Sequence, residues 1–235
     1  MALTNDLSSF AATALRLGRG LSPRVTAERR PKPPRLLELY EFEACPYCRK
    51  VRVVLCELDL DYLVHPVAHG SPRRAQLLEL GGKMQVPYLV DPNTGARLYE
   101  SEDIMAYLNA TYGAGARAGW RLPVPRLLDD VGSILATAAR LGRGGRCRTT
   151  AARAGLEPLT IYNMEGSPYC RKVREALSER DLPHIVKSLP KGSPARAELV
   201  QRGGKVQVPY LVDANTGREM YESDEIVGYL ETEYA

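Results

Sequence analysis

Apolar and polar residues follow one another along the first half of the chain in a pattern that predicts alternating strands and helices. Short apolar runs predict strands, and runs with apolar residues at helical spacing predict helices. The predicted elements are, in order, strand 36–42, helix 46–58, strand 62–67, helix 71–80, strand 86–91, strand 97–99 and a helix from Ser101 through Leu108. The order β-α-β-α-β-β-α predicts an α/β domain.

The same pattern returns in the second half because the chain contains an internal repeat. Residues 37–112 align without a gap to residues 159–234 at an offset of about 122, with about 41 of roughly 76 positions identical. We therefore divide the chain into an N-terminal helix with a basic linker (1–34), repeat 1 (35–112), a second helix with its connector (113–156) and repeat 2 (157–235).

Each repeat is preceded by a segment with apolar residues at helical spacing. These residues are Leu3, Leu7, Phe10, Ala14 and Leu17 in the first segment, and Leu127, Val131, Ile134, Leu135 and Ala138 in the second. Residues 12–20 recur as 136–144, which argues against a cleaved targeting peptide. We expect each helix to bury its apolar stripe on its own repeat or on the opposite one, with the repeats related by approximate two-fold symmetry.

Charge and composition narrow the class of protein. The net charge of +4 comes from the connectors, because residues 1–36 and 113–158 carry about +5 each while the repeats carry about −4 and −2. Without interleaved aromatic residues, these connectors predict solvated linkers and not nucleic-acid binding. No apolar run approaches the about 18 residues of a transmembrane helix. Five cysteines are too few for a disulfide scaffold, so we expect a reducing compartment, the cytoplasm or alternatively the plastid stroma.

The stretch Cys45-Pro46-Tyr47-Cys48 carries the candidate chemistry. It lies between a predicted strand and a predicted helix, where unpaired N–H groups and the helix dipole favour a thiolate at Cys45. Pro46 suits the first helical turn, and Cys48 lies one turn on, within reach for a disulfide. Two packing cysteines or half of a zinc site are the alternatives, but no second CxxC or histidine pair is present, so no metal site is predicted. The spacing favours thiol–disulfide chemistry.

Repeat 2 differs from repeat 1 at this stretch. Ser167 replaces Cys45 while Cys170 remains, so the same disulfide cannot form there. We assign redox exchange to repeat 1, and ligand binding or scaffolding to repeat 2. Cys56 is expected to be a packing residue, and Cys147 an exposed bystander thiol in the basic linker.

Three separated motifs in each repeat resemble the glutaredoxin-like N-terminal domain of glutathione S-transferases, in the thioredoxin superfamily. The motifs are Cys/Ser-Pro-Tyr-Cys, Val-Pro before a strand and Glu-Ser at a helix start. The resemblance implies two tandem thioredoxin-like domains, a cis proline beside the active cysteine, and glutathione held by the backbone before that proline and by Glu-Ser. The implied binding residues are Tyr47, Gln85, Val86, Pro87, Glu100 and Ser101 in repeat 1, and Ser167, Tyr169, Cys170, Gln207, Val208, Pro209, Glu222 and Ser223 in repeat 2. Glu-Ser also has a plain interpretation as an N-cap with a first-turn acid.

Two departures from the family pattern bear on activity. Glutaredoxins place a lysine just before the first cysteine, whereas residues 41–44 are Glu-Phe-Glu-Ala; Arg49, Lys50 or Lys83 could supply the missing cation. Only about 46 residues separate the repeats, too few for the all-helical domain of a full transferase.

The resemblance thus implies a glutathione-dependent thiol–disulfide oxidoreductase. Cys45 attacks a disulfide, and Cys48 or glutathione resolves the intermediate. The alternatives are a non-catalytic glutathione-binding or assembly module, a transferase-like protein without the helical domain, and iron–sulfur cluster handling by Cys45 with glutathione. We expect a monomer whose single chain supplies its own two-fold symmetry.

Overall fold

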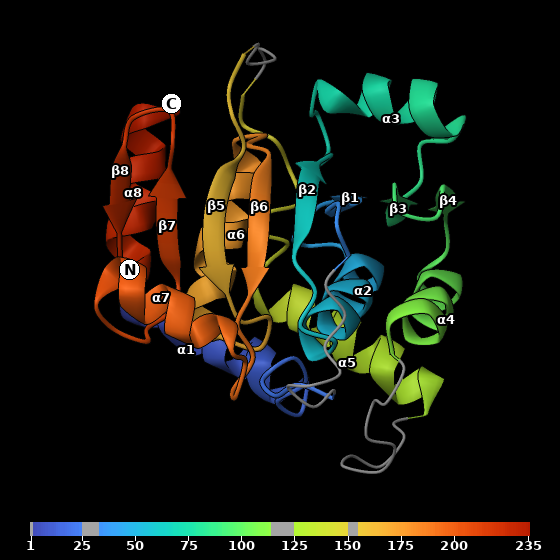
Figure 1. Cartoon of the computed structure of the whole chain (residues 1–235), viewed down its shortest axis with the longest axis horizontal. Coiled ribbons are helices and arrows are strands. Elements are labelled where there is room, and N and C mark those ends of the chain that lie inside the picture. Colours follow the sequence, from blue (N-terminus) through green and yellow to red (C-terminus); the bar gives the residue numbers. More distant parts are fainter. Residues whose placement is uncertain (1, 25–32, 114–124, 150–154) are drawn as a thin grey trace.

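The computed structural model describes residues 2–24, 33–113, 125–149 and 155–235 (Figure 1). Its elements are α1 (Ala2–Ala14), β1 (Leu37–Glu41), α2 (Pro46–Glu57), β2 (Tyr62–Pro66), α3 (Arg73–Gly81), β3 (Tyr88–Asp91), β4 (Ala96–Leu98), α4 (Ser101–Tyr112), α5 (Arg126–Ala139), β5 (Leu159–Asn163), α6 (Pro168–Glu179), β6 (His184–Ser188), α7 (Ala195–Gly203), β7 (Tyr210–Asp213), β8 (Arg218–Met220) and α8 (Ser223–Glu233). The predicted α/β order is confirmed in both repeats. The third strand begins two residues later than predicted, after Pro87, which has no N–H to donate to a ladder.

All eight strands form one sheet, in the order β4-β3-β1-β2-β6-β5-β7-β8. Within each repeat the first two strands are parallel and the other pairs antiparallel. The repeats join where β2 pairs with β6 in antiparallel register, centred on Leu63 opposite Ile185. These two residues occupy equivalent positions in the two repeats, so the register confirms the approximate two-fold symmetry.

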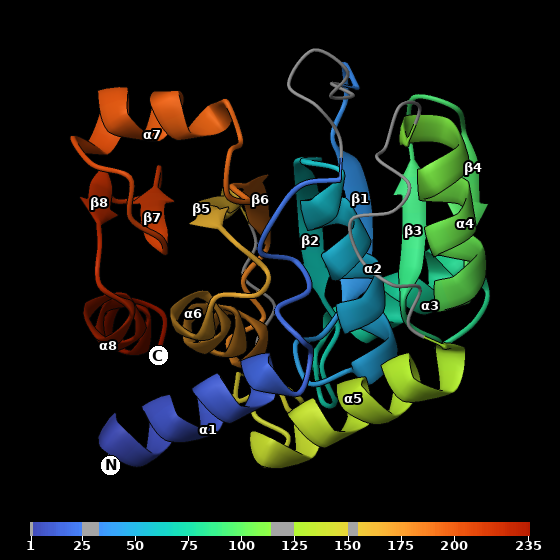
Figure 2. The same ribbon diagram turned by 90° about the horizontal axis from the view of Figure 1, so that it is seen from below.

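Helices cover both faces of this sheet. In repeat 2, α6 and α8 lie on one face and α7 on the other, and the helices of repeat 1 are arranged in the same way (Figures 1 and 2). One apolar core extends through both repeats, and it includes Tyr62 and Val64 of β2 with Val186 of β6. The repeats therefore share a core as well as a sheet.

The helices that precede the repeats are exchanged between them. Helix α1 packs on α6 of repeat 2, α5 packs on α2 of repeat 1, and α1 and α5 contact each other beneath these helices (Figure 2). Of the two docking sites left open by the sequence, the opposite repeat is therefore the one used.

The prediction that these helices bury their apolar stripes is wrong. Their buried faces carry small and polar residues, Ser9, Ala12 and Arg16 on α1 and in the turn after it, and Ser133, Ala136 and Arg140 on α5 and in the turn after it. Small side chains let the backbones approach closely: a Cβ on Gly132 would lie 2.9 Å from the Leu15 carbonyl oxygen. The Ser9 and Ser133 hydroxyls donate to backbone carbonyls at the starts of α6 and α2. Arg171 of α6 and Arg49 of α2 in turn donate to the Ser9 and Ser133 carbonyls.

The connectors are also less solvated than expected where the structure describes them. Arg16 and Arg140 are buried and pair with Asp129 at 2.8 Å and Glu175 at 2.5 Å. Cys147 is half-buried, not exposed, and its N–H donates to the His69 carbonyl at 2.8 Å. Of the prolines in the first connector, Pro31 lies outside the described residues.

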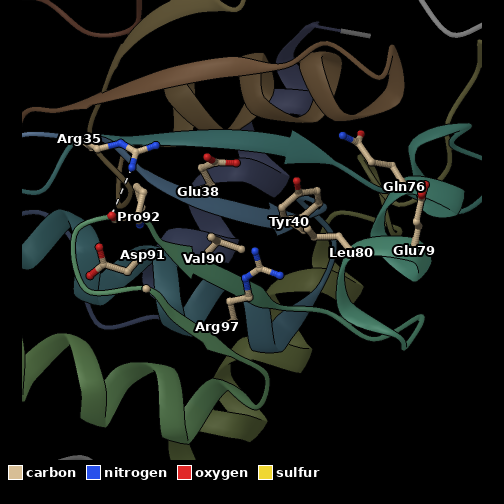
Figure 3. A pocket seen from close by; sticks show the side chains of 11 residues that line it. Arg35, Glu38, Tyr40, Gln76, Glu79, Leu80, Val90, Asp91, Pro92 and Arg97 are labelled. Atoms are coloured by element: carbon tan, nitrogen blue, oxygen red, sulfur yellow. Dashed lines mark hydrogen bonds between the residues drawn. The ribbon is translucent and has the colours of Figure 1, made fainter.

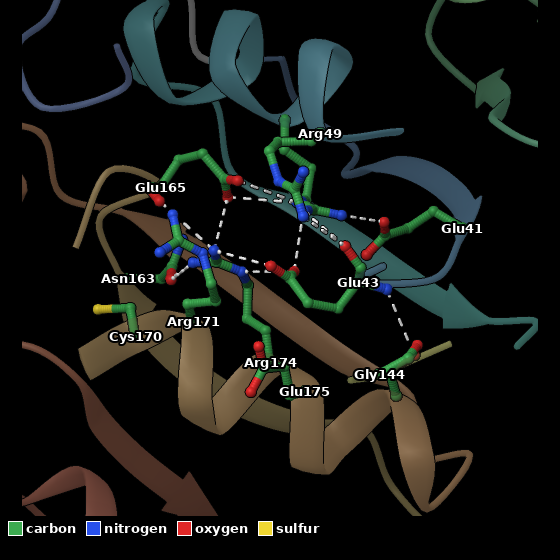
Figure 4. A network of polar contacts seen from close by, with 12 residues as sticks. Glu41, Glu43, Arg49, Gly144, Asn163, Glu165, Cys170, Arg171, Arg174 and Glu175 are labelled. Atoms are coloured by element: carbon green, nitrogen blue, oxygen red, sulfur yellow. Dashed lines mark hydrogen bonds and ion pairs between the residues drawn. The ribbon is translucent and has the colours of Figure 1, made fainter. Parts of the chain in front are cut away.

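A buried network of ion pairs lies where the two repeats meet (Figure 4). Arg52 contacts Glu43 at 2.8 Å and Glu165 of the other repeat at 3.3 Å. Arg174 contacts Glu43 at 2.9 Å and Glu165 at 3.3 Å. Each arginine thus binds one glutamate from each repeat, and all four side chains are almost fully buried. The network gives Glu43, which lies two residues before Cys45, a structural role.

Glu41 and Asn163 occupy equivalent positions at the edges of the network. The Glu41 carboxylate pairs with Arg52, whereas the Asn163 amide oxygen accepts from Arg174 at 2.7 Å. Burial raises the pKa of Glu41 to about 7 despite Arg52. Burial acts in the same direction on Glu43, but Arg174 and Arg52 outweigh it and hold the pKa of Glu43 at about 2.

Replacing Glu41 by glutamine is expected to flatten the dependence of stability on pH. The pKa of Glu41 is higher in the folded chain than in the unfolded one. The protonated Glu41 side chain therefore contributes fully to the free energy of unfolding below about pH 4, and this contribution is lost as pH rises towards 7. Relative to the variant, the wild type should lose on the order of 3 kcal/mol of unfolding free energy across that window. Urea unfolding of both proteins between pH 4 and 8 measures this; parallel curves would contradict the pKa assigned to Glu41.

Candidate active site

The topology brings the three motifs of repeat 1 to one edge of the sheet. Tyr40, near the end of β1, lies opposite Tyr88, the first residue of β3, so the turn that carries Cys45 and the loop that carries Pro87 are neighbours. Strand β4 runs antiparallel to β3 and returns the chain to this edge, where Ser101 begins α4. The same arrangement holds in repeat 2.

Cys45 is the N-cap of α2, and its environment stabilises the thiolate. Its Sγ accepts a hydrogen bond from the Cys48 N–H at 3.2 Å. Hydrogen bonding from Cys48 lowers the pKa of Cys45, although burial opposes the shift. Burial and the neighbouring Cys45 sulfur raise the pKa of Cys48 well above its ordinary value. Cys45 is therefore the better nucleophile of the pair, which the structure records as two free thiols.

Ser167 takes the place of Cys45 in repeat 2 with the same geometry. Its Oγ accepts from the Cys170 N–H at 3.3 Å. Burial raises the pKa of Cys170, so this repeat has no thiol favoured as a nucleophile. Cys56 is buried as expected, and its thiol donates to the Gly20 carbonyl at 3.3 Å.

The bonds from Val86 to Pro87 and from Val208 to Pro209 are both cis, as the family resemblance implied. The residues before them tie this loop to the helix start: the Gln85 amide donates to Glu100, and the Gln207 amide donates to Glu222 at 2.5 Å. The Val-Pro and Glu-Ser motifs are thus in contact in both repeats.

Glu100 and Glu222 adopt a backbone conformation that is rare for residues other than glycine. Their φ angles are 61° and 64°. Each is the N-cap of its helix without a side-chain cap bond, and Ser101 and Ser223 are the first helical residues. The interpretation of Ser101 as the cap is therefore wrong. Strained backbone of this kind is concentrated at ligand sites, and here it recurs in both copies.

Helix α5 covers the turn that carries Cys45. Ser133 Oγ donates to the Pro46 carbonyl at 2.6 Å, and Thr137 Oγ1 donates to the Ala44 carbonyl at 2.8 Å. The turn after α5 closes in as well, because a Cβ on Gly145 would lie 3.1 Å from the Ala44 Cβ. As a result Cys45 is only 4% exposed.

The equivalent cover in repeat 2 comes from α1. Ser9 Oγ donates to the Pro168 carbonyl at 2.7 Å, and Thr13 Oγ1 accepts from Arg171 at 3.0 Å. Sequence reasoning missed these covering residues. The signal was present, since Ser9 and Thr13 recur as Ser133 and Thr137 on the polar sides of the two helices.

Two of the three cations considered for a ligand carboxylate are used elsewhere. Arg49 is buried and donates to the Ser133 carbonyl at 2.7 Å. Lys50 is buried between Glu102 and Asp130, at 2.7 Å from the latter. Lys83 remains exposed, with its ammonium 5.6 Å from the centre of the Tyr99 ring.

Within the described parts of the chain, no group of three or more His, Cys, Asp or Glu side chains is placed to hold a metal ion. None of the described helices combines the length and apolar character needed to cross a membrane.

The fold and these motifs correspond to a known family. The model described as "Glutathione S-transferase, N-terminal domain" matches the chain twice, over residues 39–116 and 161–235. The chain therefore belongs to this family and contains two tandem copies of its thioredoxin-like domain.

Two individual proteins match this chain over different lengths. The chain is 33% identical over 79 residues to the glutathione S-transferase-like protein tpcF of Aspergillus fumigatus, a match that covers 34% of this chain and 35% of that protein. It thus spans about a third of the length of this relative. Among solved structures, the trimeric glutathione transferase TDR1 of Leishmania matches with a TM-score of 0.30 and 13% identity, over 85% of this chain and 68% of that one.

Proposed function

We propose that the chain is a glutathione-dependent thiol–disulfide oxidoreductase whose reactive thiol is Cys45. The observation that carries this proposal is the N-cap position of Cys45, where the hydrogen bond from Cys48 lowers its pKa. Cys170 and Cys56 are buried thiols with raised pKa values. Membership of the glutathione S-transferase family supports glutathione as the co-substrate.

The reaction begins when the Cys45 thiolate attacks a glutathione mixed disulfide. A Cys45–glutathione disulfide forms, the original S–S bond breaks, and the substrate leaves as a thiolate that takes up a proton. A second glutathione thiolate then attacks the glutathione sulfur of this intermediate, releasing oxidised glutathione and the Cys45 thiolate. Alternatively, Cys48 loses its proton and attacks Cys45, which expels glutathione and leaves a Cys45–Cys48 disulfide. Electrons balance in both routes, because each step breaks one S–S bond, forms another and releases one thiolate.

The ligand would lie along the edge formed by Tyr47, Val86 and the Glu100–Ser101 helix start. Among the described residues, neither the Val86 backbone groups nor the Ser101 hydroxyl has a hydrogen-bond partner, so both can meet a peptide-like ligand. Repeat 2 offers the same edge with Ser167 in place of the nucleophile. It would bind glutathione without exchanging it.

A non-catalytic glutathione-binding module is the second candidate. The burial of Cys45 under α5 favours it, since a disulfide must reach the sulfur before exchange can occur. The two candidates differ in whether a covalent intermediate forms on Cys45.

Trapping the intermediate tests the proposal. Wild-type protein and the variants Cys48→Ala and Cys45→Ser are incubated with a glutathionylated peptide, and peptide mass spectrometry maps each mixed disulfide. We expect glutathione on Cys45 in Cys48→Ala, a Cys45–Cys48 bridge in the wild type after mild oxidation, and neither in Cys45→Ser. Binding of glutathione without any adduct would favour the binding module, and an adduct confined to Cys147 or Cys170 would overturn the assignment of Cys45.

Replacing Ser101 by alanine is expected to weaken glutathione binding to repeat 1 by roughly 10-fold or more. The hydroxyl would donate to the γ-glutamyl carboxylate, and a hydrogen bond to a charged group contributes about 1.5–3 kcal/mol. Calorimetric titration measures the affinity, with Ser223→Ala as the matched control for repeat 2. Unchanged affinity in Ser101→Ala would limit Ser101 to a structural role.

A further inference from the structure

The two exchanged helices present a broad apolar surface to solvent. Ten of the sixteen exposed large apolar side chains among the described residues belong to α1, α5 and the turns that follow them, and they are between 38% and 90% exposed. We refer to the outward side of these helices as the outer apolar face. Its central residues are Leu7, Phe10, Leu128, Val131, Ile134 and Leu135.

This exposure is a property of both copies. Leu7 and Phe10 on α1 occupy the positions of Val131 and Ile134 on α5, and all four side chains are exposed, with Phe10 also meeting the Tyr169 ring of α6 edge-on at 5.6 Å between centroids. The opposite side of each helix is fixed by hydrogen bonds such as those from Ser9 and Ser133. The helices therefore cannot rotate their apolar sides inward without breaking these contacts.

We propose that the outer apolar face binds the same face of a second copy of this chain. Fully burying one Leu, Ile, Val or Phe side chain removes on the order of 60–120 Å² of apolar surface from water. Ten such side chains at about half exposure offer roughly 300–600 Å², which is the size of the largest patch on a typical monomer, a patch that is often functional. A standard interface buries about 800 Å² per partner, a little over half of it apolar, so this face is large enough for a stable dimer.

Symmetry favours a second copy over an unrelated partner. Helices α1 and α5 are equivalent elements in contact across the approximate two-fold axis (Figure 2), so the face has apolar side chains on both sides of this axis, Leu7 and Phe10 on one and Val131 and Ile134 on the other. Leu128 and Leu135 add apolar area on α5 alone, where α1 has Thr4 and Ala11. Two such faces can pack with their helices crossed into a four-helix layer and bury both patches at once. The contact is isologous and closes at two copies. This proposal departs from the sequence-based expectation of a monomer.

Charge argues against an anionic lipid surface as the occupant. Lipid-binding helices carry basic side chains around the apolar stripe. Here Arg16 and Arg140 are buried under the helices, and Arg19 pairs with Asp129. The exposed Arg143 donates to Asn5 at 2.9 Å. The charged side chains beside the stripes on the helices include Asp6 and Asp130, which are acidic and already paired with lysines.

Sedimentation and light scattering of the full chain test the proposal. At about 50 µM, well above the micromolar constants of weak interfaces of this size, the wild type is expected at twice the 26.0 kDa chain mass. The double variant Leu7→Glu/Val131→Glu should be monomeric, with the dissociation constant of the dimer raised by at least about 100-fold. Val200→Glu, at a half-exposed apolar position on α7 across the sheet, is the matched control and should remain dimeric.

Circular dichroism and thermal unfolding show whether the double variant is folded. If its fold is lost, Leu128→Gln/Leu135→Gln on the same face replaces it. A monomeric wild type at this concentration, or a dimer that survives the folded double variant, overturns the proposal. Flotation with phosphatidylserine vesicles tests lipid as the occupant. If a monomeric wild type binds the vesicles and the double variant does not, the face is assigned to lipid and the proposal is overturned. These readouts do not depend on glutathione or on Cys45 chemistry.

Discussion

Replacing Glu43 by alanine is expected to lower the free energy of unfolding by about 3–5 kcal/mol. The variant leaves Arg52 and Arg174 buried with fewer anionic partners, and an uncompensated buried charge is strongly destabilising. The loss should be largest near neutral pH. Because the pKa of Glu43 lies at about 2 in the folded chain, below its unfolded value, the wild type itself loses this contribution as pH falls towards 2.

Glu231→Ala provides the matched control for this prediction. It removes an exposed carboxylate that lies 3.2 Å from the largely buried Arg180, outside the network between the repeats, and a pair open to solvent on one side is expected to contribute only about 0–1 kcal/mol. Urea denaturation near pH 7 compares both variants with the wild type. Equal small losses in the two variants would show that the ion pairs between the repeats do not hold them together.

Loosening α5 is expected to speed the alkylation of Cys45 by about 10- to 100-fold. The double variant Ser133→Ala/Thr137→Val removes the hydroxyls that bond to the carbonyls of Pro46 and Ala44, on either side of Cys45. Two neutral hydrogen bonds contribute about 2 kcal/mol together, so opening of the cover becomes correspondingly more frequent. Reaction with iodoacetamide, followed at the Cys45 peptide by mass spectrometry, measures the rate.

The chain contains its own control for this experiment. Ser9→Ala/Thr13→Val makes the same change in α1, which covers the turn of Ser167 and not that of Cys45. It should leave the alkylation rate of Cys45 unchanged. Equal acceleration by both pairs would mean that general loosening of the fold, and not local uncovering, exposes the thiol.

The secondary structure and the chemistry of the motifs were predictable because both depend on neighbouring residues. Apolar periodicity placed most of the helices and strands to within a few residues, and Gly82 ends α3 in the left-handed conformation that glycine favours. The position of Cys45 at the start of α2 followed from a strand, a proline and a helix in sequence. The cis geometry before Pro87 followed from the family resemblance.

The relation between the repeats was not predictable from the same patterns. Arg52 and Glu165 are far apart in the sequence, and only the pairing of β2 with β6 brings them together. The orientation of α1 and α5 was misjudged because a helical stripe identifies an apolar face but not its partner. The serines on these helices, which look solvated in the sequence, bond to the opposite repeat, and the arginines that follow the helices, Arg16 and Arg140, are buried in ion pairs.

The pairing of β2 with β6 also explains why two copies share one chain. In an isolated repeat, β2 would be an open edge strand, which promotes association with other strands, and its buried Tyr62 and Val64 would lose their cover. Covalent linkage supplies the second repeat at a local concentration in the millimolar range when the connector can span the distance. The paired sheet then persists at any dilution, and the two halves are free to diverge, as Cys45 and Ser167 have done.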